Sequence, residues 1–186
     1  MQLSKLSYYS DFAVYPVVVV ALAALDTSRA SWRAGAEWLA AMSAGWVLWS
    51  VLEYVLHRIA LHRMPIFSPM HGLHHASPLA LIGTPTWMSI PIWSVGVLLP
   101  AWWYLGFNVA DGLTVGVMLG YWWYGIVHHV IHHGVLKRSD YFNGLRAWHM
   151  RHHYSPKGGN FGVTTTLWDR VFGTVISHHD KTVPSP

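Results

Sequence analysis

Long apolar stretches constrain the fold of this 186-residue chain more than any other feature. Four of them lie at about 12–25, 36–56, 86–106 and 109–127. Because a helix needs roughly 20 apolar residues to cross a bilayer, the first stretch needs tilting, extension by its neighbours or only partial insertion. Only 11% of the residues are charged and 12 are Trp, a composition that is rare in soluble domains. The sequence therefore predicts an all-α integral membrane protein, a single domain over 1–186 with about four transmembrane helices.

The lengths of the connections predict which parts of the chain share one side of the membrane. The first and third connections (DTSRASWRAG and GFNVAD) are short, whereas 57–85 and 128–186 are long and polar. An even number of helices places both long segments, with every histidine, on the same side. Of the 12 Lys and Arg residues, only Arg29 and Arg33 fall on the opposite side. The positive-inside tendency therefore predicts a cytoplasmic cap and cytoplasmic termini.

The composition also excludes several kinds of site and partner. The chain has no cysteine, which excludes disulfides, thiolate metal sites and a cysteine nucleophile. Its net charge is +4, but the Lys and Arg residues do not form a solvated stripe, so we expect no nucleic-acid partner. The N-terminal segment contains Asp11 and Pro16 and no small-residue cleavage site. It is interpreted as an anchor, not as a secretory signal.

Ten histidines form four boxes outside the apolar stretches: His57-x4-His62, His71-x2-His74-His75, His128-x3-His132 and His149-x2-His152-His153. Residues three and four apart share a helix face, so each triplet is expected to aim three imidazoles into one space. The His128 pair continues the fourth apolar helix by one turn. His57 and His62 are about 140° apart on an ideal helix. Either they serve two different metals, or the helix breaks before Met64-Pro65.

Histidines in this number and spacing favour metal binding over packing. Neutral imidazoles packed without a shared ligand leave ring nitrogens unsatisfied, and protonated ones repel one another. Ten imidazoles exceed the ligands of one ion, so we expect two ions with about five nitrogens and one open position each. Open positions indicate catalysis. Glu53, one turn before His57, is expected to orient an imidazole through its other N–H; a solvated carboxylate at the helix end is the alternative.

At these boxes the chain resembles the fatty acid hydroxylase/sterol desaturase superfamily of di-metal membrane oxygenases, and most closely its fatty acid 2-hydroxylase branch. The motifs that carry the resemblance are HRIALH at 57–62, HGLHH at 71–75, HHVIHH at 128–133, WHMRHH at 148–153 and FGVTTTLWDRVFGT at 161–174. The last motif is the most specific, because a generic metal site has no reason to share it. The resemblance covers about 45–175. Carotene hydroxylases are similar in size and box number, but less similar over the last motif.

The resemblance implies four membrane helices under a cytosolic helical cap that holds two metals. The implied ligands are His57, His62, His71, His74, His75, His128, His132, His149, His152 and His153. His129 and His133 fall between or beyond the pattern positions, and a shift of register would exchange them with His128 and His132. His178 and His179 match no box and are interpreted as part of a polar tail. Asp169 lies in a family motif, where it supports a ligand N–H, caps a helix or pairs with Arg170.

The implied activity is O2-dependent hydroxylation of a lipid acyl chain, with fatty acid or sphingolipid 2-hydroxylation expected. Such chemistry needs a redox metal, so iron is expected for activity, although nitrogen ligands also bind zinc and a purified sample can contain it. No fused cytochrome b5 domain is found, so a separate cytochrome b5-like or ferredoxin-like protein is expected to supply electrons. Aromatic residues that can line a substrate tunnel, or pack in the core, are Trp87, Trp93, Tyr121 and Tyr124.

Two alternatives remain at this point. One is oxidation of a sterol or carotenoid, either hydroxylation or desaturation, within the same superfamily. The other is a metal-binding or metal-transport membrane protein without oxygen chemistry. A transporter is expected to line a path through the bilayer with ligands, whereas the histidines of this chain cluster outside the predicted spans.

Overall fold

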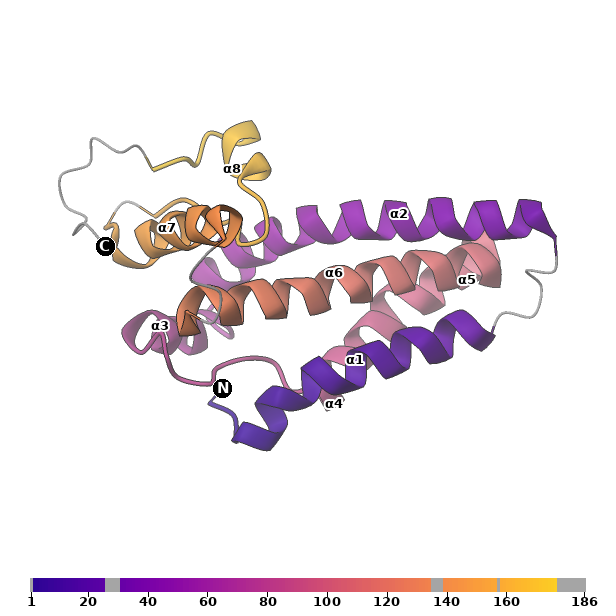
Figure 1. Cartoon of the computed structure of the whole chain (residues 1–186), viewed down its shortest axis with the longest axis horizontal. Helices are drawn as coiled ribbons and strands as arrows, with labels where there is room; N and C mark the ends of the chain where they lie inside the picture. The colour runs from indigo at the N-terminus through magenta and orange to yellow at the C-terminus, as the bar shows by residue number, and fades with distance from the viewer. Residues whose placement is uncertain (1, 26–30, 135–138, 157, 177–186) are drawn as a thin grey trace. The chain divides into compact units, whose positions relative to one another are not determined.

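The computed structural model describes residues 2–25, 31–134, 139–156 and 158–176. Within these ranges the chain is helical apart from its connections and one isolated bridge between Gln2 and Ile82 (Figure 1). This confirms the predicted all-α class. The chain forms two compact units, Met1–Ser50 with Leu81–Trp123 and Val51–Ala80 with Tyr124–Pro186. A single domain over 1–186 stays a prediction.

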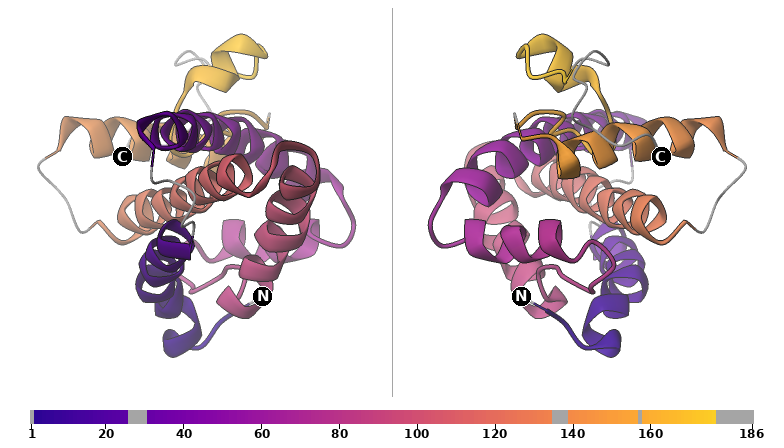
Figure 2. Two further views of the ribbon diagram at one scale, coloured as in Figure 1. Left: turned by 90° about the vertical axis from the view of Figure 1, so that its right-hand side faces the viewer. Right: turned by 90° about the vertical axis from the view of Figure 1, so that its left-hand side faces the viewer.

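Among the described residues, three helical segments are long and apolar enough to cross a membrane. They are α1 (Lys5–Leu25), α2 (Trp32–Val55) with η1 (Leu56–Leu61), and the run of α4 (Thr86–Trp93), η2 (Ser94–Leu98) and α5 (Leu99–Leu105). The first is longer than its apolar stretch because residues from Lys5 onwards extend it. In the third, Pro91 lies inside α4 and Pro100 in the first turn of α5, and the π-helix η2 joins the two. The prolines are thus accommodated by a local change of helix type. Figure 2 shows the ribbon of the chain from two further sides.

The fourth predicted stretch, 109–127, lies in α6 (Phe107–His133), which is not one of these three segments. Its first turns carry Asp111 and Thr114, both fully buried. Asp111 Oδ2 accepts a 2.6 Å hydrogen bond from Trp38 Nε1 on α2. These two polar side chains of α6 are therefore buried inside the first unit. The number of membrane crossings stays a prediction.

Small residues let α2 and α6 approach closely within the first unit. A Cβ added at Gly116 would overlap the Met42 carbonyl oxygen, and one added at Gly120 would overlap the Trp49 side chain. Gly112 lies one turn earlier on the same face of α6, where a Cβ would be 2.6 Å from the Trp38 carbonyl oxygen. This four-residue glycine spacing is the small-xxx-small pattern of packed membrane helices, and the sequence analysis did not identify it.

An aromatic cluster fills the interior of the first unit. The rings of Trp49 and Trp93 lie 5.4 Å apart, and Tyr121 lies 5.3 Å from Trp49 and 5.0 Å from Tyr15. Trp93 Nε1 donates to Tyr15 Oη at 3.1 Å. Of the proposed tunnel residues, Trp93 and Tyr121 are thus packed against other rings, whereas Trp87 is 72% exposed. A tunnel lined by them stays a prediction.

The second unit contains all four histidine boxes. After η1 the chain turns at Met64-Pro65, where the sequence analysis gave a helix break as one of two alternatives. The N–H groups of Phe67 and Ser68 donate to the Met64 carbonyl at 3.0 and 2.9 Å. The helix α3 (Ser68–Ala76) follows directly. As expected, α6 continues without a break through the HHVIHH motif to His133. The described part of this unit has two further helices, α7 (Asp140–Tyr154) and the short α8 (Leu167–Val171).

Candidate metal centre

A π-helix places His57 and His62 in the same group of histidines. On an ideal α-helix these residues would point about 140° apart, but Leu56–Leu61 forms η1, whose wider turn pairs residues five apart. Their ring centroids lie 5.2 Å apart. The pair therefore serves one group, and the helix does not need to break between its members.

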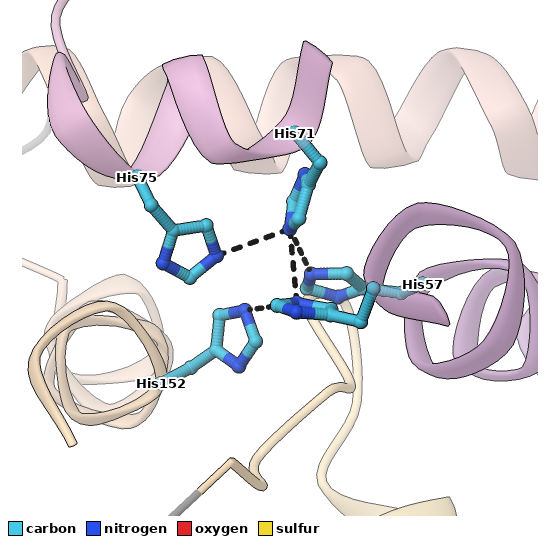
Figure 3. A group of neighbouring side chains, drawn as sticks. His57, His71, His75 and His152 are labelled. Carbon is cyan, nitrogen blue, oxygen red and sulfur yellow. Dashed lines mark hydrogen bonds between the residues drawn. The ribbon is translucent and has the colours of Figure 1, made fainter. Parts of the chain in front are cut away.

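The first group, here called cluster 1, contains His57, His62, His71, His75 and His152, with one nitrogen of each within 4.8 Å of the others. Figure 3 shows His71 and His75 projecting from α3 toward His57 and His152, which come from η1 and α7. His71 Nε2 is central, since it lies 3.0 Å from the Nε2 atoms of His57 and His62 and 3.1 Å from that of His75. His62 Nε2 is also 3.1 Å from His152 Nε2.

The second group contains His74, His132, His149 and His153, again with ligand atoms within 4.8 Å of one another. His128 joins it, because its Nε2 atom lies 3.1 Å from His74 Nε2. These five residues are here called cluster 2. His149 Nε2 lies 3.0 Å from His132 Nε2 and 3.1 Å from His153 Nε2.

The structure divides each triplet between the two clusters, which corrects the expectation that a triplet aims all its rings into one space. His71 and His75 belong to cluster 1 and His74 to cluster 2, whereas α7 gives His152 to cluster 1 and His149 and His153 to cluster 2. Each cluster thus receives a pair from one helix end, two rings from one triplet and a single ring from the other. This reciprocal exchange gives two groups of five, the ligand number expected for each of two ions.

The nitrogen distances fit a shared ion better than a hydrogen-bonded network. His71 Nε2 has three nitrogen neighbours at 3.0–3.1 Å, yet a neutral imidazole nitrogen is either a donor or an acceptor. An ion about 2.1 Å from each nitrogen would hold adjacent octahedral ligands about 3.0 Å apart, against about 3.4 Å in a tetrahedron. The observed separations match the octahedral edge. The metal roles of these residues stay a prediction, which the geometry fits.

Burial keeps the imidazoles neutral, the form that binds metal. It lowers the pKa of His62 and of His74 to about 4, with repulsion from His75 adding to the effect. It also lowers the pKa of His132 and of His152 to about 3, and that of His71 to about 2. Because burial is the first cause in every case, both clusters offer uncharged nitrogens at neutral pH.

Two backbone carbonyls fix the rings of His57 and His152. His57 Nδ1 donates to the Phe161 carbonyl at 2.5 Å, and His152 Nδ1 donates to the Gly159 carbonyl at 2.7 Å. A neutral imidazole that donates through Nδ1 leaves the Nε2 lone pair for a metal. The segment 159–164, here called the carbonyl loop, therefore sets both the tautomer and the orientation of two cluster 1 rings.

Two buried carboxylates hold the carbonyl loop. Glu53 Oε1 accepts the N–H groups of Val163 and Thr164 at 2.7 and 2.8 Å, and its Oε2 accepts the Thr164 hydroxyl at 2.5 Å. Asp169 Oδ1 and Oδ2 each accept one backbone N–H of the loop at 2.8 Å, from Phe161 and Gly162. The expected bond from Glu53 to an imidazole is replaced by this indirect support, because its described hydrogen bonds all go to the loop.

Asp169 has further partners that separate its predicted roles. It accepts hydrogen bonds from the Thr174 hydroxyl at 2.7 Å and from Trp148 Nε1 at 3.3 Å. Its side chain is fully buried, whereas Arg170 beside it is exposed. The residue thus ties α7, α8 and the carbonyl loop together, which supports a ring-orienting role over pairing with Arg170.

Sequence analysis missed the residues that shape the carbonyl loop. Asn160 is fully buried with a φ of 53°, a left-handed conformation that asparagine tolerates better than most residues. Its Nδ2 donates to the Trp148 carbonyl at 3.2 Å, and its Oδ1 accepts the Ile176 N–H at 2.9 Å. The Gly158-Gly159-Asn160 run was the available signal, since it marks a turn.

The other histidines and the last proposed tunnel residue lie outside the clusters. His129 and His133 stack on each other with centroids 4.3 Å apart, and neither belongs to a ligand group. The register with His128 and His132 as cluster members is thus the one that the structure adopts. Tyr124 stacks on His128 at 5.5 Å and 9°, beside cluster 2. His178 and His179 lie outside the described residues.

Comparisons with known proteins identify a family and a solved structure that this chain resembles. The model of the fatty acid hydroxylase family matches residues 42–174, which include all ten cluster residues and the carbonyl loop. The solved structure of full-length Scs7p, in which only the hydroxylase domain is visible, has a TM-score of 0.80 at 23% identity. It covers 96% of this chain and 70% of that one, so the two share a fold.

Two curated relatives show the same similarity in sequence. A dihydroceramide fatty acyl 2-hydroxylase from Arabidopsis thaliana is 34% identical over 146 residues, which cover 70% of this chain and 58% of the relative. A fatty acid 2-hydroxylase from Macaca fascicularis is 33% identical over 144 residues, which cover 71% and 38%. The matched region thus spans about two fifths to three fifths of the length of these relatives.

Proposed function

We propose, since this chain belongs to the fatty acid hydroxylase family, that it hydroxylates the acyl chain of a membrane lipid at the carbon next to the carbonyl group. The observation that carries the proposal is the pair of five-histidine clusters within a region matched to that family. The named activities of the relatives, acyl 2-hydroxylation of fatty acids and of dihydroceramide, supply the position and the substrate class.

The reaction consumes one O2, two electrons and two protons for each C–H bond that becomes C–OH, and it releases one water. Iron held by the two clusters would supply the redox chemistry that hydroxylation of an unactivated C–H bond requires. Zinc in a purified sample would be a replacement, because zinc has no redox chemistry.

The residues of the chain have distinct parts in this proposal. The ten cluster histidines would hold two ions through their inward nitrogens, and the Phe161 and Gly159 carbonyls orient two of the rings. His57 lies at the end of the segment Trp32–Leu61, which is long and apolar enough to cross a membrane. Cluster 1 is therefore built onto the end of such a helix, where an acyl chain from the bilayer can approach while its headgroup stays in the polar region.

Orientation and electron supply are part of the proposal. We place the cap and both termini in the cytoplasm, because ten of the 12 Lys and Arg residues lie on the histidine side of the predicted topology. The two electrons come from a cytochrome b5-like or ferredoxin-like donor. The O2 that is consumed enters from solution or from the bilayer.

The test is expression in a host strain that lacks acyl 2-hydroxylation, followed by mass spectrometry of its lipids. Growth under isotopically heavy O2 should yield 2-hydroxy acyl chains that carry one heavy oxygen atom. The variant His132→Ala should abolish the product and reduce the metal content, whereas His133→Ala, the same substitution one residue later and outside the clusters, should leave both unchanged.

Other products would overturn the proposal in specific ways. Oxygen in a sterol or carotenoid would assign the chain to the related activities. Bound metal with no oxidised lipid and no O2 consumption, even with an electron donor present, would favour a metal-binding or metal-transport protein.

A further inference from the structure

The short helix α8 and the residues after it expose apolar side chains and bury an acid. Leu167 is 51% exposed, Val171 59%, Phe172 49% and Val175 45%, whereas Asp169 is fully buried. This is the reverse of what a helix on a water-facing surface shows. Exposed apolar side chains that gather in one short segment often mark an interaction site.

Contacts within the second unit join this surface to a candidate membrane helix. Phe172 stacks on Tyr54 of α2 with centroids 5.2 Å apart and planes at 15°, and the Tyr54 and Thr174 hydroxyls lie 2.9 Å apart. Tyr54 belongs to the segment Trp32–Leu61. The segment that exposes these side chains is thus packed, through the buried Tyr54 ring, against the end of a helix that is apolar enough to lie in lipid.

The length of α2 indicates the depth at which this contact lies. Trp32, 79% exposed and followed by Arg33, suits one membrane–water interface. Tyr54 follows 22 residues after Trp32 in the sequence, slightly more than the roughly 20 residues that span a bilayer. A membrane-spanning α2 would therefore have Tyr54 near its opposite interface. Arg58 Nη1 donates to the Tyr54 hydroxyl at 2.8 Å, so a cation would lie at the level of the lipid headgroups.

We propose that α8 with residues 172–175, here called the α8 surface, lies on the membrane and inserts its apolar side chains between the lipid headgroups. The occupant of this surface is lipid and not another protein, because the segment is packed against the end of a candidate membrane helix. The exposed Arg170 and the neighbouring Arg58 complement the headgroup phosphates. Contact with the membrane then holds α8 in place. Because Asp169 on α8 accepts two N–H groups of the carbonyl loop, this contact also limits the motion of the loop beside cluster 1.

The absence of cysteine from the chain permits a direct test with single thiols. Val171→Cys is labelled with an environment-sensitive fluorophore, and the full chain is reconstituted in phosphatidylcholine vesicles that contain lipids spin-labelled near the headgroup or deep in the acyl chain. Val95→Cys, 64% exposed on the candidate span Thr86–Leu105, is the lipid reference. Asp140→Cys, at an exposed acid on α7, is the water reference.

The label at Val171 should be quenched most strongly by the shallow spin label, and several-fold less by aqueous iodide than the label at Asp140. Val95 should respond most to the deep spin label. Leu167→Cys should behave as Val171→Cys does, and the metal content of each variant shows that it has folded.

Equal iodide quenching at Val171 and Asp140, with no response to the spin-labelled lipids, would overturn the proposal. The proposal would also fail if the label were protected from iodide only at high protein density in the vesicles and lost this protection on dilution. That result would assign the surface to a second copy of the chain. Both outcomes are independent of whether the protein hydroxylates lipid.

Discussion

In cluster 1, the outer nitrogens of His57 and His152 donate to backbone carbonyls, whereas in cluster 2 the Nδ1 atoms of His149 and His153 are buried without a partner in the described part of the chain. The two clusters otherwise draw their rings from the helices in the same reciprocal way. Of these four rings, only the two in cluster 1 are hydrogen-bonded to the carbonyl loop. It is held in turn by Glu53 and Asp169.

This difference shows that two similar sets of histidine ligands can differ in the hydrogen bonds that fix their rings. Hydrogen bonds from the outer nitrogen fix the tautomer and orientation of a metal-binding histidine, and their loss typically weakens metal binding by roughly 10–100-fold. We therefore expect cluster 1 to bind its ion more tightly than cluster 2. Titration of the metal-free protein against a competing chelator should show two classes of site.

Each triplet contributes two rings to one cluster and a single ring to the other cluster. The largest effect is expected from removing that single ring. His152→Ala should lose the ion of cluster 1, and His74→Ala the ion of cluster 2, because each removes a direct ligand. Product should fall at least about a hundredfold in both, more than the loss expected for an outer hydrogen-bond partner. Metal analysis and anomalous X-ray scattering would locate the ion that remains. Loss of the same ion in both variants would contradict the division of the triplets.

A smaller but more selective effect is expected from Asp169→Asn. The amide keeps one oxygen, so the N–H of either Phe161 or Gly162 loses its acceptor in a fully buried place. Metal affinity at cluster 1 should fall by roughly 10–100-fold with cluster 2 little changed, as measured by chelator competition. The matched control is Asp140→Asn, which alters an exposed acid on α7. Equal weakening of both sites by Asp169→Asn would remove the distinction between them.

Local spacing accounts for what the sequence could predict of this site. The four boxes, the turn at Met64-Pro65 and the extension of α6 through HHVIHH depend on residues close in sequence, so helix geometry and proline chemistry were sufficient. The fold class followed from the apolar stretches in the same way. The box spacing predicts ten ligands, and the structure brings all ten into two groups.

The division of the rings could not be predicted, because it depends on distant contacts. An ideal α-helix was assumed for His57 and His62, and only the structure shows the π turn of η1. The role of Glu53 depends on Val163 and Thr164, more than 100 positions later in the sequence. A spacing rule contains no information on such contacts, and it cannot assign His74 and His75, which are adjacent in sequence, to different clusters.

Acid should affect both clusters alike, because the histidines of both are buried. The hydrogen bonds of the carbonyl loop, by contrast, reach only cluster 1 among the four rings compared above. His62 of cluster 1 and His74 of cluster 2 each have a pKa of about 4 in the folded protein, below the value of about 6.5 for an unfolded chain. The unfolded state therefore binds protons first, and stability of the metal-free protein should fall as the pH drops from about 6.5 toward about 4. Melting temperatures in detergent would measure this fall. His62→Asn and His74→Asn should reduce its slope equally, and a flat profile would contradict the burial of both clusters.

The smallest effect is expected from Glu53→Gln, which tests whether Glu53 acts through its charge or through its geometry. In the structure one oxygen, Oε1, accepts both backbone N–H groups, and the other accepts only the Thr164 hydroxyl. The glutamine oxygen can keep the two backbone bonds, and its NH2 group can donate to the hydroxyl oxygen. Metal affinity at cluster 1 should then change by less than about threefold, well short of the loss expected when a ring-orienting partner is removed. Glu53→Ala, which removes all three bonds, should weaken cluster 1 as Asp169→Asn does. If Glu53→Gln were as damaging as Glu53→Ala in chelator competition, the negative charge of Glu53 would have to act on the cluster itself, and the carbonyl loop would no longer explain why the two clusters differ.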